Sequence, residues 1–165
     1  MADEVTIKLA QSTDAAAVLR FLREAATESD AVLIPHLQDV SVDQEAHNID
    51  LINTFDDCVM LLAVLGEEIV GLVTIMVLAD QPTTGELGVV VRKKYWRNGI
   101  GQLLVDEAEY WFDHYSSLET LILSVFQENL PAIKLYQKMN FVQTGAADEE
   151  GHHAIQMKYV KEEKE

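Results

Sequence analysis

Cysteine is nearly absent from this chain, since Cys58 is the single one among 165 residues. A lone cysteine cannot form an internal disulfide, so the sequence fits a reducing compartment and we expect a cytoplasmic location. The residue begins an apolar run, which favours a buried, inert thiol over a nucleophile. The first ten residues are acidic and lack the basic and apolar regions of a signal peptide.

Long apolar runs and an excess of positive charge are also missing. No stretch approaches the roughly 20 apolar residues that span a bilayer, so no membrane partner is expected. Twelve Lys and Arg residues oppose 28 Asp and Glu, for a formal net charge of −16. This balance argues against a nucleic-acid partner, although it would suit a cationic substrate such as an amine. The motif G-x-x-x-x-G-K-[ST] is absent, so hydrolysis of ATP or GTP has no support.

The order of strand-like and helix-like segments predicts an α/β fold in one domain over residues 1–165, with a solvated tail from about 161. Strands are expected where the residues alternate or are rich in Val, Ile and Leu: 5–10, 58–66, 68–79, 84–93, 118–126 and two within 141–160. Helices are expected where the apolar spacing is helical: about 13–28, from Ser41, from Gly99, and about 130–139.

Three details of this pattern are specific enough to be tested. Ser12 or Thr13 should cap the first helix. The second helix should turn four apolar side chains inward, namely Val42, Ile49, Ile52 and Phe55. The strand–helix–strand segment over 84–126 should form a parallel, right-handed crossover within a mixed sheet.

A basic, glycine-containing turn stands between a strand and a helix and reads RKKYWRNGIG (92–101). A helix N-terminus offers unpaired N–H groups, and glycine lets a phosphate approach the backbone closely. Four cations, at positions 92–94 and 97, add positive charge there, and Lys134 and Lys138 lie one helical turn apart further on. The turn therefore predicts a polyanionic, pyrophosphate-bearing ligand, with a simple tight turn as the alternative. The dinucleotide-binding fingerprint is not met, because the third glycine is missing.

A second motif follows and reads NLPAIKLYQKMNF (129–141). Together with WRNGIG (96–101), it resembles the two signatures of the GNAT superfamily of acyl-CoA-dependent N-acetyltransferases. The order of elements matches as well, so the resemblance covers essentially the whole chain. Trp96 stands where the family has Gln or Arg, and Asn140 stands where it has glycine, a mild change because Asn tolerates positive φ.

The resemblance implies a GNAT-type fold: a mixed, mostly antiparallel sheet of six or seven strands, flanked by about four helices and splayed between strands 4 and 5. Acetyl-CoA, the implied acyl donor, would lie in that splay. The implied cofactor-binding residues are Val89, Val90, Val91, Arg97, Asn98, Gly99, Ile100, Gly101, Gln102, Asn129 and Lys138.

The resemblance also implies two proton-transfer roles. Tyr136 would protonate the leaving thiolate, with a core-edge aromatic side chain as the alternative. Glu86 is the candidate base for the amine, acting through water, and the alternative is an outward-facing strand carboxylate. No metal is expected, since His152 and His153 lack partners at a metal-binding spacing.

The expected function is acetyl transfer from acetyl-CoA to a primary amine, and the alternative is a catalytically silent acyl-CoA-binding module. The acceptor would lie against residues 24–55 and 143–153, which are rich in acids and would suit a cationic small molecule or a protein N-terminus. Relatives are often homodimers, so a homodimer is a further expectation.

Overall fold

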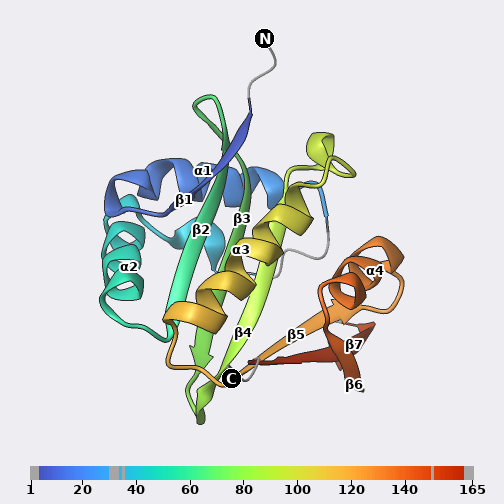
Figure 1. Cartoon of the computed structure of the whole chain (residues 1–165). Helices are drawn as coiled ribbons and strands as arrows, with labels where there is room; N and C mark the ends of the chain where they lie inside the picture. The colour runs from blue at the N-terminus through green and yellow to red at the C-terminus, as the bar shows by residue number, and fades with distance from the viewer. Residues whose placement is uncertain (1–3, 30–33, 35, 150, 162–165) are drawn as a thin grey trace.

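The computed structural model describes residues 4–29, 34, 36–149 and 151–161. Seven strands form one sheet in the order β1-β2-β3-β4-β5-β7-β6 (Figure 1). The strands are β1 (Val5–Leu9), β2 (Cys58–Leu65), β3 (Glu68–Leu78), β4 (Gln81–Val91), β5 (Thr120–Phe126), β6 (Val142–Glu149) and β7 (His152–Val160). The β4–β5 pair is parallel and every other pair is antiparallel, so the predicted mixed, mostly antiparallel α/β sheet is confirmed.

The parallel strands β4 and β5 separate soon after they meet. They pair over Thr84–Glu86 and Thr120–Ile122, and the ladder ends there. Beyond that point β4 continues to Val91 and pairs with β3 alone. The predicted splay between strands 4 and 5 is therefore confirmed, and Glu86 lies at the fork.

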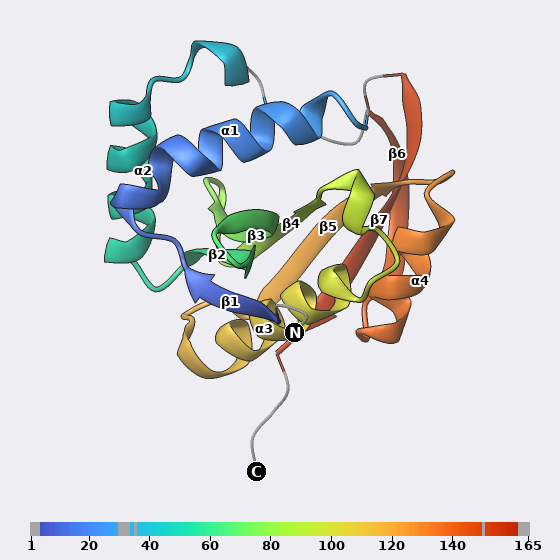
Figure 2. The same cartoon turned by 90° about the horizontal axis from the view of Figure 1, so that it is seen from above.

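In the described ranges four α-helices lie against the sheet. Their bounds are α1 (Ala15–Ala26), α2 (Val42–Thr54), α3 (Ile100–Tyr115) and α4 (Leu130–Lys138). Figures 1 and 2 show α1 and α2 on one face and α3 on the other. One apolar cluster joins α1 and α2 to one sheet face through Leu19, Ile49 and Leu62, and the other joins α3 to the opposite face through Leu104 and Phe112. Side chains of α4 pack against the α3 cluster.

The first two helices begin differently from one another. The predicted cap at Ser12 or Thr13 is wrong, because both residues belong to a 3-10 turn that precedes α1, and Asp14 Oδ2 accepts from Gln11 N over 2.8 Å. Ser41 does cap α2: its Oγ accepts from Gln44 N at 3.1 Å, and the Gln44 side chain accepts from Ser41 N at 2.8 Å. This reciprocal pair satisfies two helix-end donors at once.

The inward face of α2 is only partly as predicted. Ile49 and Ile52 are buried, whereas Val42 and Phe55 are exposed, because they lie at the two ends of the helix, beyond the stretch that packs on β2. Glu45 instead occupies an inward position and is 8% exposed. A carboxylate therefore stands on the core-facing stripe of this helix.

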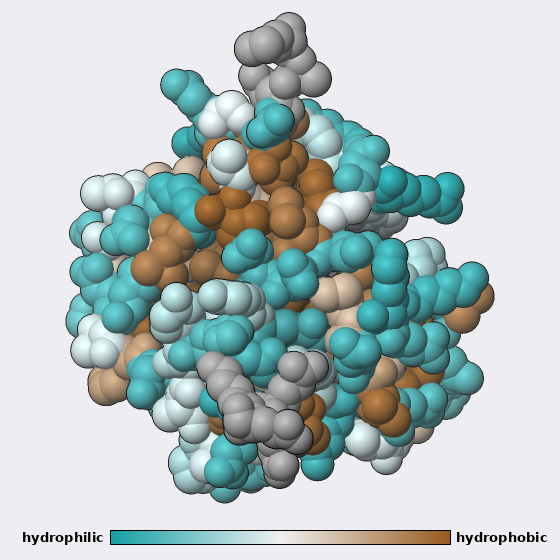
Figure 3. Space-filling view, viewed as in Figure 1, coloured by the Kyte–Doolittle hydropathy of each residue, from teal (hydrophilic) through white to brown (hydrophobic). Residues whose placement is uncertain are grey.

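The outer surface is largely hydrophilic on the face drawn in Figure 3, which is the face that carries α3. Apolar side chains gather in its upper part, where β1 and the β2–β3 hairpin lie. In the part of the chain that the structure describes, no helix has the length and apolar character needed to cross a membrane.

Candidate functional site

Two cavities meet at the splay. The first is a cleft of about 470 Å³ between the C-terminal end of β4, the N-terminus of α3 and helix α4. The second, of about 580 Å³, lies on the α1–α2 side of the sheet and crosses β3, β4 and β5. Tyr136, Asn129 and Ala132 of the α4 motif line both cavities, together with Val89 and Val90. A molecule in either cavity would therefore reach the same phenol.

The N-terminus of α3 presents backbone donors to the first cleft. Gly99 is its N-cap, with φ of 80°, and Arg97 also has a positive φ, of 69°. No described side chain caps the helix, so the first-turn N–H groups of Ile100, Gly101 and Gln102 lack intrahelical partners. All three residues line the cleft. A 16-residue helix with such an end favours an anionic group there.

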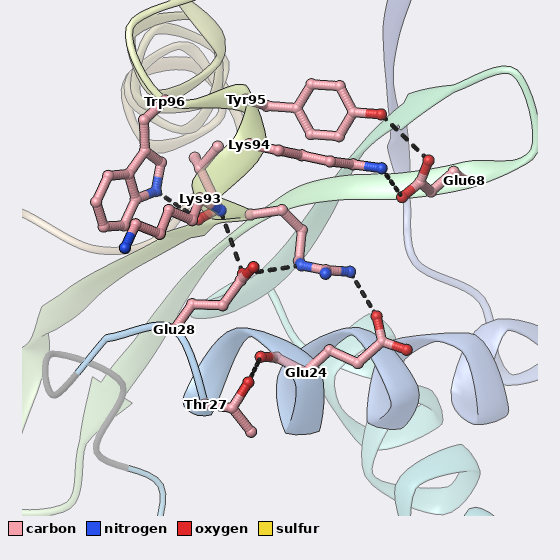
Figure 4. A network of polar contacts seen from close by, with 10 residues as sticks. Glu24, Thr27, Glu28, Glu68, Lys93, Lys94, Tyr95 and Trp96 are labelled. Atoms are coloured by element: carbon pink, nitrogen blue, oxygen red, sulfur yellow. Dashed lines mark hydrogen bonds and ion pairs between the residues drawn. The ribbon is translucent and has the colours of Figure 1, made fainter.

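The positive charges that precede this turn are not all directed at the cleft. Arg92 pairs with two carboxylates from the α1 segment, Glu24 and Glu28, and Lys94 pairs with Glu68 at 3.5 Å (Figure 4). The four cations were predicted to add positive charge for a polyanion. Arg92 and Lys94 are instead paired with acidic side chains distant in sequence, and neither lines the cleft. Arg97 does line the cleft.

Glu28 connects α1 to the same loop. Its Oε1 accepts from Arg92 Nε at 2.9 Å and from the backbone N–H of Lys93 at 3.2 Å. The hydrogen bond from Arg92 is the main cause that lowers the pKa of Glu28 below its ordinary value. Glu28 also lines the cleft, so this pair fixes one wall of it.

Trp96, which stands where the family pattern has Gln or Arg, makes its own contacts at the cleft. Its indole Nε1 donates to Val91 O over 2.8 Å, and Lys93 Nζ lies 5.9 Å from its ring centroid. The side chain also lines the cleft. Trp96 thus ties the glycine turn to the end of β4 (Figure 4).

Helix α4 carries the second predicted motif. Asn129 is its N-cap, and its Oδ1 accepts from Ala132 N over 3.3 Å. Pro131 follows in the first turn, where its missing N–H costs nothing. One turn later Tyr136 reaches the meeting point of the cavities, and burial raises the pKa of its phenol to about 12. The phenol therefore stays protonated at neutral pH and can donate.

The second cavity holds the predicted base. Glu86 lines it and is exposed to it, at the last position where β4 pairs with β5. Ser124 of β5 and Thr74 of β3 supply further polar atoms, and Leu72 and Met76 are among its apolar walls. Glu86 and Tyr136 thus line one continuous space, which the sequence alone could not show.

Nine of the eleven predicted cofactor-binding residues lie on the wall of the first cleft, and Asn98 and Lys138 do not. Lys138 Nζ donates instead to Gln102 Oε1 at 3.1 Å, which joins α4 to α3. Their roles in binding stay predictions. Glu45 and Asn48 line the second cavity from α2. Both fall within the predicted acceptor segment 24–55, but neither was singled out from the sequence. The signal was present, because Glu45 lies four residues before the inward-facing Ile49.

The predicted acceptor segments are described only in part. Residues 30–33, 35 and 150 fall within them and lie outside the described residues, as do 162–165 of the predicted tail. In the final hairpin, His153 forms an ion pair with Asp148 of the neighbouring strand. Within the described ranges, no three His, Cys, Asp or Glu side chains are grouped to hold a metal ion.

Solved structures share this fold. An acetyltransferase of the GNAT family from Streptococcus pneumoniae is 30% identical, with a TM-score of 0.86 over 95% of this chain and 99% of that one. The yncA protein of Salmonella typhimurium is 16% identical, with a TM-score of 0.80 over 97% of this chain and 95% of that one. A ribosomal-protein-alanine N-acetyltransferase from Brucella melitensis is 21% identical, with a TM-score of 0.78 over 94% of this chain and 99% of that one.

The latter two resemblances concern the fold alone, because their identity is low. Among curated protein sequences, none is significantly similar to this chain. The model of the acetyltransferase (GNAT) family matches residues 19–141, which is most of the sequence and includes both motifs and Glu86. Taken with the Streptococcus pneumoniae structure, this match shows that the chain belongs to the GNAT family of acetyltransferases.

Proposed function

We propose that this chain transfers the acetyl group of acetyl-CoA to a primary amine, by direct attack of the amine on the thioester in a ternary complex. The observation that carries the proposal is the meeting of two cavities at Tyr136. One has the backbone donors for an anionic cofactor, and the other has a carboxylate, Glu86, for the amine. A reaction between two bound molecules needs such an arrangement.

Acetyl-CoA is the donor used by GNAT acetyltransferases, and yncA was solved with it as cofactor. The residues of this chain fit it: the uncapped N-terminus of α3 suits the pyrophosphate, and the open edge of β4 over 89–91 suits an amide-containing arm. When bound, acetyl-CoA supplies an acyl group activated by a thiol leaving group. Both Gly101 and Leu135 of α4 line the cleft, and a Cβ at position 101 would lie 3.3 Å from the Leu135 side chain. Glycine therefore leaves the backbone at this position open to a ligand.

The open edge of β4 has a further task. Attack by the amine places negative charge on the carbonyl oxygen, and a fixed backbone N–H within residues 89–91 would stabilise it. One such donor contributes roughly 3–4 kcal/mol to the lowering of a barrier. The donor is already positioned, because β4 is held by β3 on its other edge.

Glu86 and Tyr136 divide the proton transfers. An alkyl ammonium, with a pKa of about 10.4, must lose a proton before its nitrogen can attack. Glu86 takes this proton through a bound water, and its position at the fork and on the wall of the second cavity supports this role. Tyr136 gives its phenolic proton to the departing thiolate, and the phenol is protonated at neutral pH because its pKa lies far above 7.

The acceptor is an amine of a cationic small molecule or of a protein N-terminus, in keeping with the carboxylates of the second cavity. The Brucella melitensis relative acts on an alanine of a ribosomal protein, but its low identity gives no reason to transfer that acceptor to this chain. We also place the reaction in the cytoplasm, because the chain has a single cysteine and a half-buried thiol.

Thiol release from acetyl-CoA with a panel of amines tests the proposal, alongside calorimetric titration of acetyl-CoA. Turnover that falls in both Glu86→Gln and Tyr136→Phe would support it. The competing function is a silent acyl-CoA-binding module, favoured by Trp96 at the family's Gln or Arg position. Tight binding without turnover for every amine would favour that module, and absence of acetyl-CoA binding would overturn both.

A further inference from the structure

The far end of the second cavity contains a carboxylate that the proposed reaction does not use. Glu45 lines this cavity from α2 and is 8% exposed. It lies on the same helical face as Ile49 and Ile52, where an apolar side chain would be expected. Burying a carboxylate is costly unless positive charge or hydrogen bonds compensate for it.

The protein itself supplies little of that compensation. Asn48 Nδ2 donates to Glu45 Oε1 over 3.0 Å. Within the described ranges of the chain, no Lys, Arg or His side chain forms an ion pair with Glu45. An ionised carboxylate can accept about four hydrogen bonds. Glu45 therefore keeps capacity for a cationic donor that enters from the cavity.

A favourable position at the start of α2 does not explain this burial. Acidic side chains in a first helical turn are stabilised by the helix dipole. Asp43 has the same advantage in the same turn and is exposed. The dipole accounts for acids at this helix end in general, but not for one that faces a cavity.

The cavity places Glu45 at a distance from the reacting centre. Glu45 belongs to α2, which packs on β2, whereas Tyr136 belongs to α4, on the far side of the splay (Figure 2). Residues of β3 lie between these ends, with Leu72 and Met76 as apolar walls. From β2 to β4 the sheet spans two strand spacings, or about 10 Å. The lining thus has a carboxylate at each end, and between them Leu72 and Met76 are apolar and Thr74 adds one hydroxyl.

We infer that Glu45 is the specificity residue of the acceptor cavity and binds a second protonated group on the acceptor amine. The favoured acceptor is then a molecule with two cationic ends joined by an apolar chain of about 10 Å. The inference rests on the proposed function for the identity of the reacting end, which lies at Glu86 and Tyr136. Glu45 touches the acceptor but takes no part in the chemistry.

A substrate series tests this without any variant. Thiol release is measured with α,ω-diaminoalkanes of increasing length, each compared with the monoamine and the ω-amino acid of equal length. At the best length, kcat/KM should be roughly 10- to 100-fold higher for the diamine than for the monoamine, the range for a hydrogen bond to a charged group. The ω-amino acid should be the poorest, because its carboxylate would meet Glu45. A diamine no better than its monoamine at every length would overturn the inference.

Glu45→Gln, an isosteric change that keeps an acceptor for Asn48, then assigns the effect. The diamine advantage should disappear through a higher KM, while the monoamine and acetyl-CoA values stay as in wild type. Asp43→Asn is the matched control, since it removes a charge from the same helical turn without facing the cavity. A diamine advantage that persists in Glu45→Gln would reject Glu45 as its cause.

Calorimetric titration of the diamine into the CoA-bound protein separates this inference from the proposed function. Glu45-dependent diamine binding without turnover for any amine would support the site and overturn the enzymatic proposal. Turnover that is independent of Glu45 would support the enzymatic proposal and overturn the assignment of Glu45. If neither turnover nor diamine binding occurs, both are overturned.

Discussion

Arg92 and Glu28 join the loop after β4 to the end of α1, through a 2.9 Å hydrogen bond between Arg92 Nε and Glu28 Oε1. Arg92 Nη1 also bonds Glu24, one helical turn earlier (Figure 4). Both side chains are mostly shielded from solvent, with 18% of Arg92 and 22% of Glu28 exposed. The pair therefore sets the position of a segment whose next residues include several that line the cleft: Trp96, Arg97, Gly99, Ile100 and Gly101.

Removing this link should weaken acetyl-CoA binding without slowing the chemical step. In Arg92→Gln the two glutamates lose their cation and repel the pyrophosphate, so we expect the KM for acetyl-CoA to rise about two- to fivefold, the range for a partly exposed ion pair. Steady-state kinetics with a saturating amine measures this, and kcat should stay unchanged.

Lys94→Gln is the control for that experiment. It removes the same charge two residues later, where the partner is Glu68 rather than the α1 segment. We expect its KM for acetyl-CoA to stay close to the wild-type value. Equal effects of the two variants would mean that the basic turn acts through its total charge, and not through the position that Arg92 imposes.

The same pair predicts a pH dependence of stability. The pKa of Glu28 lies below its ordinary value of 4.5 in the folded protein, chiefly because of the hydrogen bond from Arg92. Since the folded pKa is depressed, the stabilisation is fully present above about pH 4.5 and is lost as the pH falls through the folded value. The difference in urea midpoint between wild type and Glu28→Gln should thus be constant near neutrality and shrink in acid.

A difference in midpoint that stays the same from neutral pH to well below pH 4.5 would contradict this assignment. Thr54→Ala is a suitable reference, because it removes an exposed hydrogen bond, to Asp50 O, that involves no titrating group. Its effect on the urea midpoint should not vary across the same range.

Much of this arrangement could be predicted from sequence, and what could be predicted is local. The alternation of apolar residues identified the strands, and Gly99, with φ of 80°, marked the start of α3. What escaped prediction depends on residues far apart in the chain. Glu28 lies 64 residues before Arg92, and β7 inserts between β5 and β6. Local periodicity contains no information about either, so the pairing of Arg92 with Glu28 could not be predicted.

Glu45 escaped prediction for a different reason. A carboxylate in the first turn of a helix is normally exposed, and the sequence gives Asp43 and Glu45 the same character. Their positions differ, because Glu45 lies on the helical stripe of Ile49 and Ile52 and Asp43 does not. That spacing points inward for Glu45, but its charge argued for an exposed position. Buried polar residues of this kind break the expected pattern, and such breaks often occur where a ligand binds.

Tyr136→Phe should remove the proton donor but keep the cleft. The ring would still pack 5.9 Å from the ring of Phe141, so acetyl-CoA binding measured by calorimetry should change little. Loss of a general acid lowers kcat by roughly 10²- to 10⁴-fold. Wild-type kcat/KM should not decline between about pH 8 and pH 10, because the phenol, with a pKa of about 12, keeps its proton there. Near-normal turnover in Tyr136→Phe would assign the side chain to packing.

Two glycines with the same positive φ distinguish the cost of backbone strain from the loss of cofactor contact. Gly99 and Gly151 both have φ of 80°, and a Cβ at either would meet nothing within 4 Å. Alanine at each position should therefore destabilise the protein by a similar amount, about 1–2 kcal/mol, the cost of a left-handed conformation. Thermal unfolding measures this cost.

Gly99 lines the cleft and Gly151 lies in the β6–β7 hairpin turn, so Gly99→Ala alone should also weaken acetyl-CoA binding. If the two variants bind acetyl-CoA equally well, the N-terminus of α3 does not approach the pyrophosphate, and the cleft must hold its ligand through Arg97 and the open edge of β4 instead.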